Sequence, residues 1–470
     1  MKKTKIIATI GPETQDIEVL RQMILNGMDV ARLNLTHATH EFCIDILKKI
    51  EILNKELKTN VATLLDTSGP DIRTHRFIGG HAFLHKGDKI RIYMTEIMGD
   101  STKFSINYNL LDDVRLQTII KLNDGLISLE VVSKGTNYLI CEVLEEGMIS
   151  DCKSVNVPGI RFDRNFLSDK DRLDIELATK YRFDFLALSF VSTSEDVLEV
   201  SDLLIRQGNN HTLIISKIEC QNAIEEIDEI IKVSDGVMIA RGDLGVELKM
   251  EEVPALQKQI ARKAHLEGKI CIVATEMLAS MENVTRPTRA EVSDVANAVI
   301  DGVDAVMLSG ETTTGKYPIE TVQMMKKIVI ATENSIDYLS LLDKASKTRL
   351  NDITGTIAYT VAESAGSLDC AAIITPTITG YTAREISRFR PSCPIIAVSP
   401  NEETVKLLAL NFGVIPVLID ELNSLDKIIV KSTNAAKKIL NLQEGDKVVI
   451  TGGYPFKESK HTNFMKIEEL

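Results

Sequence analysis

The chain has 470 residues, of which 44% are hydrophobic and 26% are charged, and its formal net charge is −13. This length exceeds what one hydrophobic core supports, so we expect about two to four domains. The acidic balance argues against a nucleic-acid-binding protein, and no apolar run approaches the roughly 20 residues of a membrane span. Seven cysteines without disulfide-framework spacing, and no signal-peptide core at the N-terminus, favour a soluble cytoplasmic protein.

Short apolar strands alternate with helices over residues 1–72. A predicted helix over Ile17–Asn26 ends at Gly27, a common helix-terminating residue. The predicted strands are Lys5–Ile10, Asp29–Asn34 and Val61–Asp66. The alternation stops after the segment Asp66–Arg73.

Residues 73–155 show a different pattern. Runs of alternating polar and apolar residues are separated by turn pairs such as Gly-Asp and Asp-Gly, which predicts a small all-β insert. The clearest runs are Lys89–Tyr93, Leu126–Val131 and Tyr138–Val143.

The alternation of strands and helices returns over residues 156–345, where a helix is predicted to begin after Ser168. Five more strands are predicted there: Phe183–Phe190, Thr212–Glu219, Gly236–Asp243, Lys269–Glu276 and Asp304–Glu311. Three strands before the insert and five after it make the eight of a (β/α)₈ TIM barrel, which is an α/β fold. An open, doubly wound sheet is the alternative.

Residues 346–470 form a separate C-terminal unit. Helical stretches alternate with four apolar runs, at Ala371–Thr375, Pro394–Ser399, Val414–Ile419 and Lys447–Thr451. This pattern predicts an open, mostly parallel α/β domain of four or five strands.

Polar residues gather where the barrel strands end. They are Arg32, Asn34, Asp66, Thr67, Lys217, Glu219, Asp243, Thr275, Glu276, Ser309 and Glu311. In a barrel these ends meet at one mouth, where active sites lie. Carboxylates there suit Mg²⁺, and a lysine and an arginine suit phosphate, so phosphoryl transfer or enolate chemistry is indicated.

Each of these polar strand ends can also be explained without a binding site. A charged strand end can simply be solvated, and Asp243 could cap the helix that follows it. The repetition of such ends along the chain is what favours a site. Residues 310–316 nearly match a P-loop, but Tyr317 and Pro318 follow Lys316 where a serine or threonine is needed, so we reject that interpretation.

Several motifs, in order along the chain, resemble those of the pyruvate kinase family. They are Ala31–His37, Leu65–Arg73, Ile215–Glu219, Ala240–Glu247, Pro287–Asn297, Met307–Thr312 and Thr382–Pro391. The resemblance implies a barrel, a β-rich lid after its third strand and a C-terminal effector domain. It also implies phosphoryl transfer from phosphoenolpyruvate to ADP, giving pyruvate and ATP.

The resemblance assigns roles to residues at the barrel mouth. Glu219 and Asp243 match ligands of Mg²⁺ (or Mn²⁺), and Lys217 matches the lysine that neutralises the phosphoryl group in transfer. Arg32 matches a phosphate-binding arginine. The substrate carboxylate site matches the backbone of Arg241, Gly242 and Asp243, together with Thr275.

Thr275 also matches the hydroxyl near the place where the enolate is protonated. Thr275 lies at the enolate face, but an unperturbed threonine is a poor acid. We therefore expect a bound water, or a relay involving Ser309 and Glu311. Arg73 and Lys153, at the two hinges of the lid, and Asn34 match the nucleotide site.

The family's monovalent-cation site matches Asn34, Thr36, Asp66 and Thr67. Asp71 stands where K⁺-dependent members carry an acid, so we expect K⁺ dependence. Three departures bear on this region. Thr36 stands where serine is usual, Ser68 replaces a usual lysine and Glu276 replaces a usual glutamine.

The C-terminal domain carries a candidate site for a sugar-phosphate effector. Its residues are Thr375, Thr377, Thr379, Gly380 and Thr382, between a predicted strand and a predicted helix. Ordinary turn chemistry explains the same residues equally well. The resemblance further implies a homotetramer.

Two alternatives to a pyruvate kinase remain at this point. A Mg²⁺-enolate lyase, such as a pyruvate-releasing aldolase, would use the carboxylate pair but not the lid. A non-catalytic sensor of phosphorylated metabolites would account for Ser68 and Glu276.

Overall fold

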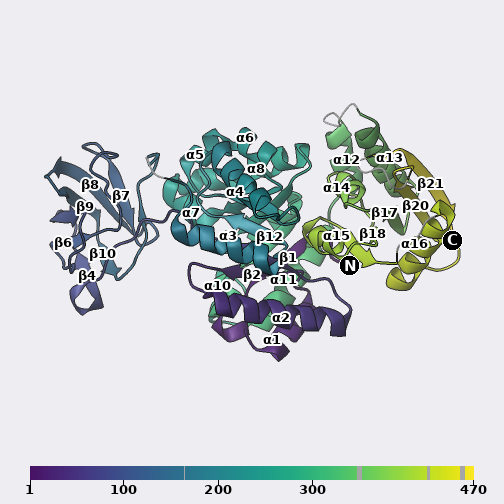
Figure 1. Ribbon diagram of the computed structural model, residues 1–470, viewed down its shortest axis with the longest axis horizontal. Helices are drawn as coiled ribbons and strands as arrows, with labels where there is room; N and C mark the ends of the chain where they lie inside the picture. Colours follow the sequence, from purple (N-terminus) through teal and green to yellow (C-terminus); the bar gives the residue numbers. More distant parts are fainter. Residues whose placement is uncertain (163–164, 347–351, 421–423, 456–460) are drawn as a thin grey trace.

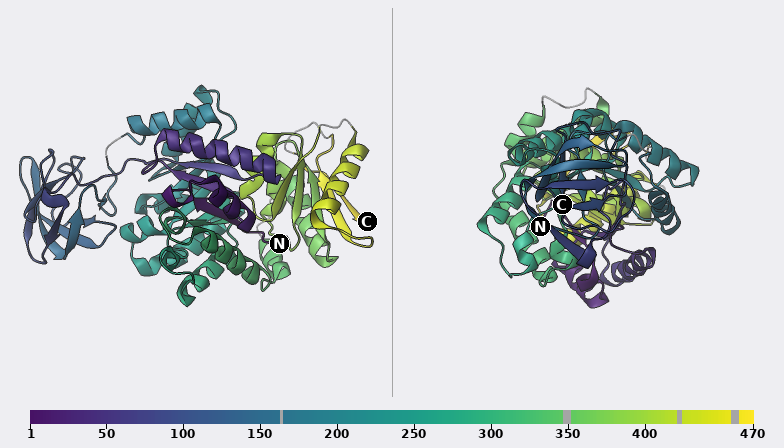
Figure 2. Two further views of the ribbon diagram at one scale, coloured as in Figure 1. Left: turned by 90° about the horizontal axis from the view of Figure 1, so that it is seen from below. Right: turned by 90° about the vertical axis from the view of Figure 1, so that its left-hand side faces the viewer.

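The computed structural model describes residues 1–162, 165–346, 352–420, 424–455 and 461–470. Its long axis runs through three bodies (Figure 1). The strands from β4 (His81–Leu84) to β11 (Val155–Asn156) lie at one end, and the barrel lies in the middle. The elements from α13 (Ile353–Ser367) to β21 (Phe464–Glu469) lie at the other end. The second view agrees with this arrangement (Figure 2, left).

The central body is a closed barrel of eight parallel strands, in the order β1-β16-β15-β14-β13-β12-β3-β2. The strands are β1 (Lys5–Thr9), β2 (Val30–Asn34), β3 (Ala62–Asp66), β12 (Phe185–Leu188), β13 (Leu213–Ile218), β14 (Gly236–Ala240), β15 (Ile270–Ala274) and β16 (Ala305–Leu308). The predicted barrel is confirmed, and the open-sheet alternative is wrong.

Helices surround the barrel because its strands are apolar on both faces. They are α1 (Ile17–Asn26), α2 (His40–Leu57), α3 (Asp169–Tyr181), α4 (Ser194–Arg206), α5 (Gln221–Glu225), α6 (Ile227–Val233), α7 (Arg241–Glu247), α8 (Val253–Leu266), α9 (Arg289–Ile300), α10 (Gly310–Thr313) and α11 (Pro318–Glu333). The next helix, α12 (Tyr338–Ser346), packs with the C-terminal body instead (Figure 1). As predicted, α1 ends at Gly27, whose φ is 120°, and Ser168 caps α3.

Three predicted strands extend too far at their C-terminal ends. Asp243 lies in α7 and Glu311 lies in α10, each just after its strand. Thr275 and Glu276 follow β15 with φ values of 69° and 54°. A left-handed backbone cannot continue a strand, so β15 ends at Ala274.

The insert between β3 and β12 is all-β, as predicted, and has its own core around Ile90, Phe104 and Leu129. One sheet has the order β10-β4 and the other β11-β7-β8-β9-β5-β6. The strands are β4 (His81–Leu84), β5 (Lys89–Tyr93), β6 (Lys103–Ser105), β7 (Ile119–Leu122), β8 (Ile127–Lys134), β9 (Tyr138–Glu145), β10 (Gly147–Ser150) and β11 (Val155–Asn156). We refer to this body as the lid.

The C-terminal body is an open sheet in the order β19-β18-β17-β20-β21, in which only β21 is antiparallel. The strands are β17 (Ala372–Pro376), β18 (Ile395–Ser399), β19 (Val414–Leu418), β20 (Lys447–Gly452) and β21 (Phe464–Glu469). Its helices are α13 (Ile353–Ser367), α14 (Tyr381–Ser387), α15 (Glu402–Leu407) and α16 (Leu425–Leu440). The predicted α/β class is confirmed.

The predicted domain boundaries, after residues 72, 155 and 345, stay predictions, and the last adjoins residues 347–351, which lie outside the described residues. No helix in the described part of the chain is long and apolar enough to cross a membrane.

A buried ion pair joins the C-terminal body to the barrel. Arg390 binds both carboxylate oxygens of Asp304, the residue before β16, at 3.0 and 2.9 Å. Arg390 Nη2 also lies 2.7 Å from His265 Nε2 on α8. Because a guanidinium can only donate, this nitrogen of His265 accepts and its ring is neutral. Burial, and then the charge of Arg390, hold the pKa of His265 well below its usual value.

Acid should therefore destabilise the protein through His265. Below about pH 6.5 the unfolded chain binds a proton on this histidine and the folded chain does not. The free energy of unfolding should then fall by up to about 1.4 kcal/mol per pH unit. Urea unfolding of His265→Gln between pH 7 and pH 5 should show a shallower slope, and His81→Gln, on the exposed lid surface, should keep the original one. Equal slopes in both variants would contradict this account.

Candidate active site

Lys217, near the end of β13, lies at the centre of a buried polar network at the barrel mouth. Its Nζ lies 2.8 Å from Glu219 Oε1 and 3.4 Å from Asp66 Oδ1, and it donates to Ser189 Oγ at 2.7 Å. Only 9% of this residue is exposed. Burial alone would lower the pKa of Lys217, but Asp66 and Glu219 outweigh burial and the pKa is raised. The ammonium is therefore charged and held in place at neutral pH.

Arg32, on β2, is the second cation of this network. Its Nε and Nη2 lie 2.8 and 2.6 Å from Asp66 Oδ2, and Nη1 donates to Thr9 Oγ1 at 2.9 Å. Asp66 is fully buried, and burial would raise its pKa, but Lys217 and Arg32 lower it. One ionised carboxylate thus orients both cations toward the mouth.

Glu219 and Asp243 form a buried acidic pair. Their carboxyl groups lie within hydrogen-bonding range of each other, and Phe190 N–H donates to Glu219 Oε2 at 2.6 Å. Burial raises the pKa of Glu219 to about 7, with Lys217 opposing and Asp243 adding to the rise. Burial also raises the pKa of Asp243. Two carboxylates without enough positive charge beside them are a donor set that fits a hard divalent cation.

Among the described residues, no group of three or more His, Cys, Asp or Glu side chains is arranged to hold a metal ion. A Mg²⁺ ion does not need such a group, because it commonly binds one or two carboxylates and completes its shell with water and substrate oxygens. Glu219 and Asp243 are therefore the residues that could hold it.

Thr275 joins the end of β15 to the start of α7. Its Oγ1 accepts from Gly242 N–H at 2.8 Å and donates to the Ala274 carbonyl at 2.7 Å. A left-handed backbone is unusual for a β-branched residue, and such strain is found at functional sites. The Arg241 side chain donates to the Thr275 carbonyl at 2.9 Å and binds Asp294 Oδ1 at 2.6 Å. Arg241 thus holds this turn with its side chain, which leaves its backbone for a ligand.

Glu311 and Ser309 follow β16. Both oxygens of the buried Glu311 carboxylate accept backbone N–H groups, from Leu278 at 3.0 Å and from Ser309 at 2.7 Å. Glu311 therefore fixes the β15 and β16 loops relative to each other. Ser309 and Thr275 both line the large cleft described next.

A cleft of about 1480 Å³ opens between the barrel mouth and the lid. Lys121 and Asp124 line it from the lid, and Gly242, Asp243 and Thr275 line it from the barrel. Lys121 Nζ donates to the Val246 carbonyl on α7 at 2.6 Å, so the lid touches the helix that carries Asp243.

Arg73 and Lys153 lie on neighbouring segments where the lid joins the barrel. Arg73 pairs with Ser154 in an isolated antiparallel bridge, and Lys153 N–H donates to Thr74 Oγ1 at 3.0 Å. The Arg73 side chain is also held, because its Nε lies 2.6 Å from Asp71 Oδ2 and its Nη1 donates to the Cys152 carbonyl at 2.8 Å.

The residues that match the monovalent-cation site lie on adjacent strand ends. Asn34 Oδ1 accepts from Thr36 N–H at 3.0 Å, and Thr67 Oγ1 accepts from Ser189 N–H at 3.3 Å. Beside them, Lys170 on α3 donates to Ser68 Oγ and, at 2.8 Å, to the Leu35 carbonyl. Ser68 carries no charge itself, yet an ammonium binds its hydroxyl.

The five candidate effector residues form the turn between β17 and α14. Thr377 Oγ1 accepts from Gly380 N–H at 3.0 Å, and Thr382 Oγ1 lies 2.9 Å from Thr462 Oγ1. The Thr375 hydroxyl is fully buried and has no hydrogen-bond partner among the described residues. Thr379 is exposed. Hydrogen bonding within the turn thus accounts for the Thr377 hydroxyl, but it does not account for the buried Thr375 hydroxyl.

Three residues of this site were not predicted: Ser189, Thr9 and Phe190. Ser189 follows β12 and links the Lys217 ammonium to the Thr67 carbonyl, to which it donates at 2.7 Å. Ser189 is a polar residue at the end of a predicted strand, so the rule that found the other residues could have found it.

Removing the Ser189 hydroxyl should slow catalysis by disordering Lys217. We expect Ser189→Ala to lower kcat about tenfold with little change in KM, because one hydrogen bond to a charged group is lost. Steady-state kinetics of Ser189→Ala and Ser192→Ala would test this. Ser192 is the matched control, since its hydroxyl contacts only the Phe190 carbonyl and the Cys220 thiol in the described structure. A similar loss in both variants would contradict the role of Ser189.

Comparison with known proteins agrees with this geometry. Residues 1–322 match the family described as pyruvate kinase, barrel domain, and residues 355–468 match pyruvate kinase, alpha/beta domain. The chain is 44% identical to a pyruvate kinase of Geobacillus stearothermophilus, covering 100% of this chain and 80% of the relative. It is 43% identical to one of Clostridium perfringens, with full coverage of both.

A solved structure gives the same result. The crystal structure of a pyruvate kinase from Cryptosporidium parvum superposes with a TM-score of 0.94 at 36% identity, covering 100% of this chain and 96% of that one. The sequence identity and the structural similarity thus both extend over the full length of the chain. The chain therefore belongs to the pyruvate kinase family and is a glycolytic phosphotransferase.

Proposed function

We propose that the cleft between barrel and lid transfers the phosphoryl group of phosphoenolpyruvate to ADP, giving pyruvate and ATP. The observation that carries this assignment is the buried Lys217 ammonium, held between Glu219 and Asp66 at the mouth. In this reaction the bond between the enol oxygen and phosphorus breaks, and a β-phosphate oxygen of ADP bonds to phosphorus. The enolate then takes up one proton at its methylene carbon.

Charge stabilisation is the main task of such a site, because the transferring group is anionic throughout. Lys217 and Arg32 supply two cations beside the phosphoryl group, and the backbone of α7 from Arg241 to Asp243 binds the substrate carboxylate. Mg²⁺, held by Glu219 and Asp243, would add positive charge and orient phosphate oxygens when bound.

Protonation of the enolate takes place near Thr275. This hydroxyl already donates to the Ala274 carbonyl, which leaves it to hold a water in place more readily than to act as an acid. Ser309 lines the same cleft. We assign the proton to a water positioned by Thr275 and Ser309, with Glu311 fixing the Ser309 loop.

The nucleotide lies under the lid in this proposal, with its phosphates facing Asn34, Arg73 and Lys153. Closing the lid would exclude water and strengthen each charge inside. K⁺ would be bound by Asn34, Thr36, Asp66 and Thr67. Asp71 cannot supply the positive charge that K⁺ would provide, because it is a carboxylate and pairs with Arg73.

The test is pyruvate release from phosphoenolpyruvate and ADP with Mg²⁺, measured with K⁺ and with Na⁺ alone. We expect turnover only with K⁺. The variant Asp71→Lys should become active with Na⁺, because its ammonium would replace the missing monovalent charge. Turnover of the unaltered enzyme in Na⁺ would contradict the K⁺ proposal alone. No turnover in either salt would favour the metabolite-sensor alternative, whereas family membership already argues against the lyase.

Regulation, assembly and location are finer proposals. The partnerless Thr375 hydroxyl supports a sugar-phosphate site in the C-terminal body. Isothermal titration with a sugar bisphosphate, compared between the unaltered protein and Thr375→Val, would test it. We also propose a cytoplasmic homotetramer, as the family resemblance implies, and light scattering of the purified protein would show its mass.

A further inference from the structure

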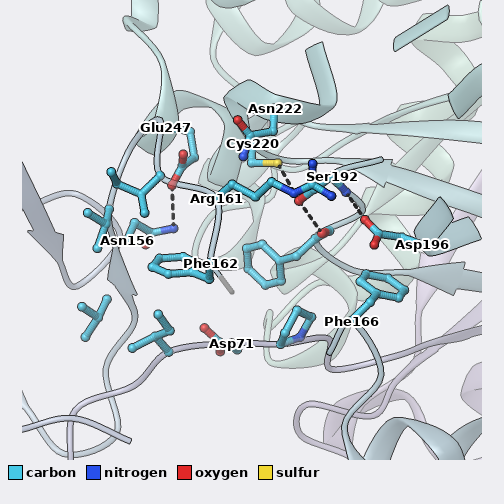
Figure 3. Close-up of a pocket in the computed structure, with 16 residues that line it drawn as sticks. Asp71, Asn156, Arg161, Phe162, Phe166, Ser192, Asp196, Cys220, Asn222 and Glu247 are labelled. Atoms are coloured by element: carbon cyan, nitrogen blue, oxygen red, sulfur yellow. Dashed lines mark hydrogen bonds between the residues drawn. The ribbon is translucent and has the colours of Figure 1, made fainter. Parts of the chain in front are cut away.

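The lid contacts the barrel at α7, and side chains from two strands of the lid make this contact. Lys121 on β7 donates through Nζ to the Val246 carbonyl at 2.6 Å. Asn156 on β11 donates through Nδ2 to Glu247 Oε1 at 3.4 Å, a bond drawn as a dashed line in Figure 3. Lys121 and Asn156 are partners in the antiparallel pairing of β7 with β11. Neighbouring positions of one sheet thus bind consecutive residues of α7.

The part of the lid that faces α7 is held in place by the lid itself. β7 is followed by a turn in which Asn123, Asp124 and Gly125 have φ values of 53°, 55° and 81°. The Ser154 hydroxyl fixes this turn, because it accepts from the Asp124 N–H at 2.9 Å and donates to Asp124 Oδ1 at 2.8 Å. A methyl group added at Gly125 would meet both γ-carbons of Val246 at 3.4 Å, so the turn packs directly on α7. The lid therefore presents a fixed surface to this helix.

α7 carries the lid contact at one end and the candidate ligand site at the other. It has seven residues, Arg241–Glu247, and a helix of that length is about 10 Å long. Gly242 and Asp243 lie in its first turn, and Val246 lies in its last. Isolated helices this short are not stable in water, so contacts with the rest of the molecule must hold α7 in place. Losing a contact at its C-terminal end should therefore affect Asp243.

The bond from Lys121 is of a kind that stabilises the end of a helix. The last carbonyls of a helix have no partner within it, and they carry partial negative charge. An ammonium that donates to one of them supplies a hydrogen bond and a favourable charge together. The same ammonium acts on Glu247, because burial raises the pKa of that carboxyl, and hydrogen bonds and the charge of Lys121 oppose the rise. Lys121 thus supplies the positive charge in the contact between lid and helix.

We propose that Lys121 is a positioning residue, which holds the lid on α7 and, through α7, fixes Asp243 and the backbone beside it. This inference rests on the proposed function, in which the nucleotide lies under the lid and the first turn of α7 binds metal and substrate. Opening the lid would break the Lys121 bond and release the end of the helix. Nucleotide binding under the lid and substrate binding at α7 should therefore favour each other, because coupling between two sites is reciprocal.

Hydrogen–deuterium exchange of the metal-free, full-length protein tests this contact without requiring activity. In Lys121→Met, the peptide that spans α7 should exchange about tenfold faster, because one hydrogen bond from a charged group is lost. The Leu248 N–H, which donates to the Leu244 carbonyl at 2.9 Å, is one of the amides that report this change. Lys121→Arg keeps a cation that can donate to the carbonyl, and it should keep the slow exchange.

Lys134→Met is the matched control for Lys121→Met. Lys134 Nζ also donates to a backbone carbonyl at 2.6 Å, but this carbonyl belongs to Leu111, within the lid. Exchange at α7 should stay slow in this variant. Exchange of β17, in the C-terminal body, should be the same in all variants, which would show that the rest of the fold is intact.

Steady-state kinetics test the coupling between lid and helix. Lys121→Met should raise KM for ADP about tenfold and change kcat at most about twofold, because saturating substrates still close the lid. Lys121→Arg should restore KM, and Lys134→Met should not change it. Unchanged exchange at α7 in Lys121→Met, an equal rise of KM in Lys134→Met, or a fall in kcat without a rise in KM would each overturn the proposal. If the unaltered protein shows no turnover, the proposed function fails, and the exchange experiment alone decides whether Lys121 holds α7.

Discussion

Replacing Lys217 with methionine should lower kcat by at least about 10³-fold, the effect expected when a cation that stabilises a transferring phosphoryl group is lost. KM for phosphoenolpyruvate should rise less, since in the proposed mechanism Arg32 and the α7 backbone still bind the substrate. Single-turnover measurement of ATP formation would separate the chemical step from product release. Lys232→Met, which removes an exposed ammonium paired with Glu229 on α6, is the control and should retain full activity.

Lys217→Met will also destabilise the protein, because it leaves Asp66 and Glu219 without their shared cation. Removing one partner of a buried ion pair costs about 3–5 kcal/mol. The double variant Lys217→Met with Glu219→Gln removes one of the stranded carboxylates and should regain part of this stability. It should regain no activity. Recovery of activity in the double variant would show that Lys217 acts through folding alone.

Replacing Asp243 with asparagine should have opposite effects on metal binding and on stability. Without metal, the variant should be more stable than the unaltered protein, because a buried carboxylate with a raised pKa is removed from beside Glu219. With Mg²⁺, the variant should lose about 10²-fold in metal affinity, since one of the two carboxylates proposed to bind the ion is gone. Thermal unfolding with and without Mg²⁺ measures the first effect, and the electron paramagnetic resonance of bound Mn²⁺ measures the second.

The pH dependence of metal binding gives an independent check. Since the pKa of Glu219 is about 7 without metal, a proton competes for this ligand below that pH. Mg²⁺ affinity should therefore fall as the pH drops below about 7. Asp228→Asn, an exposed carboxylate on α6, should leave both affinity and its pH dependence unchanged. If metal-free Asp243→Asn melted at a lower temperature than the metal-free unaltered protein, this description of the acidic pair would be contradicted.

The barrel could be predicted because each of its strands is buried on both faces and so appears in the sequence as a continuous apolar run. The residues at which the strands end were harder to predict. Asp243, Thr275 and Glu311 lie beyond strands that end early, and only the backbone angles reveal why. In the lid, β11 has two residues, too few for an alternating pattern to be visible.

The site residues could be named, but their partners could not. Nothing in the sequence indicates that the Glu311 carboxylate binds two backbone N–H groups, or that Ser189 links Lys217 to Thr67. Such links join residues from different strands across the mouth, and their geometry depends on the closed barrel. Lys170 beside Ser68 is a similar case, since the two are far apart in the chain.

The position of the lid in the chain has a consequence for synthesis on the ribosome. The strands β3 and β12 are hydrogen-bonded neighbours in the barrel, yet the whole lid is translated between them. At about 5–20 residues per second, Ala62–Asp66 waits on the order of ten seconds for its partner strand. During that interval the edge of β3 is open to incorrect pairing. The lid, with a core of its own, can become compact in the same interval, before the barrel is able to close.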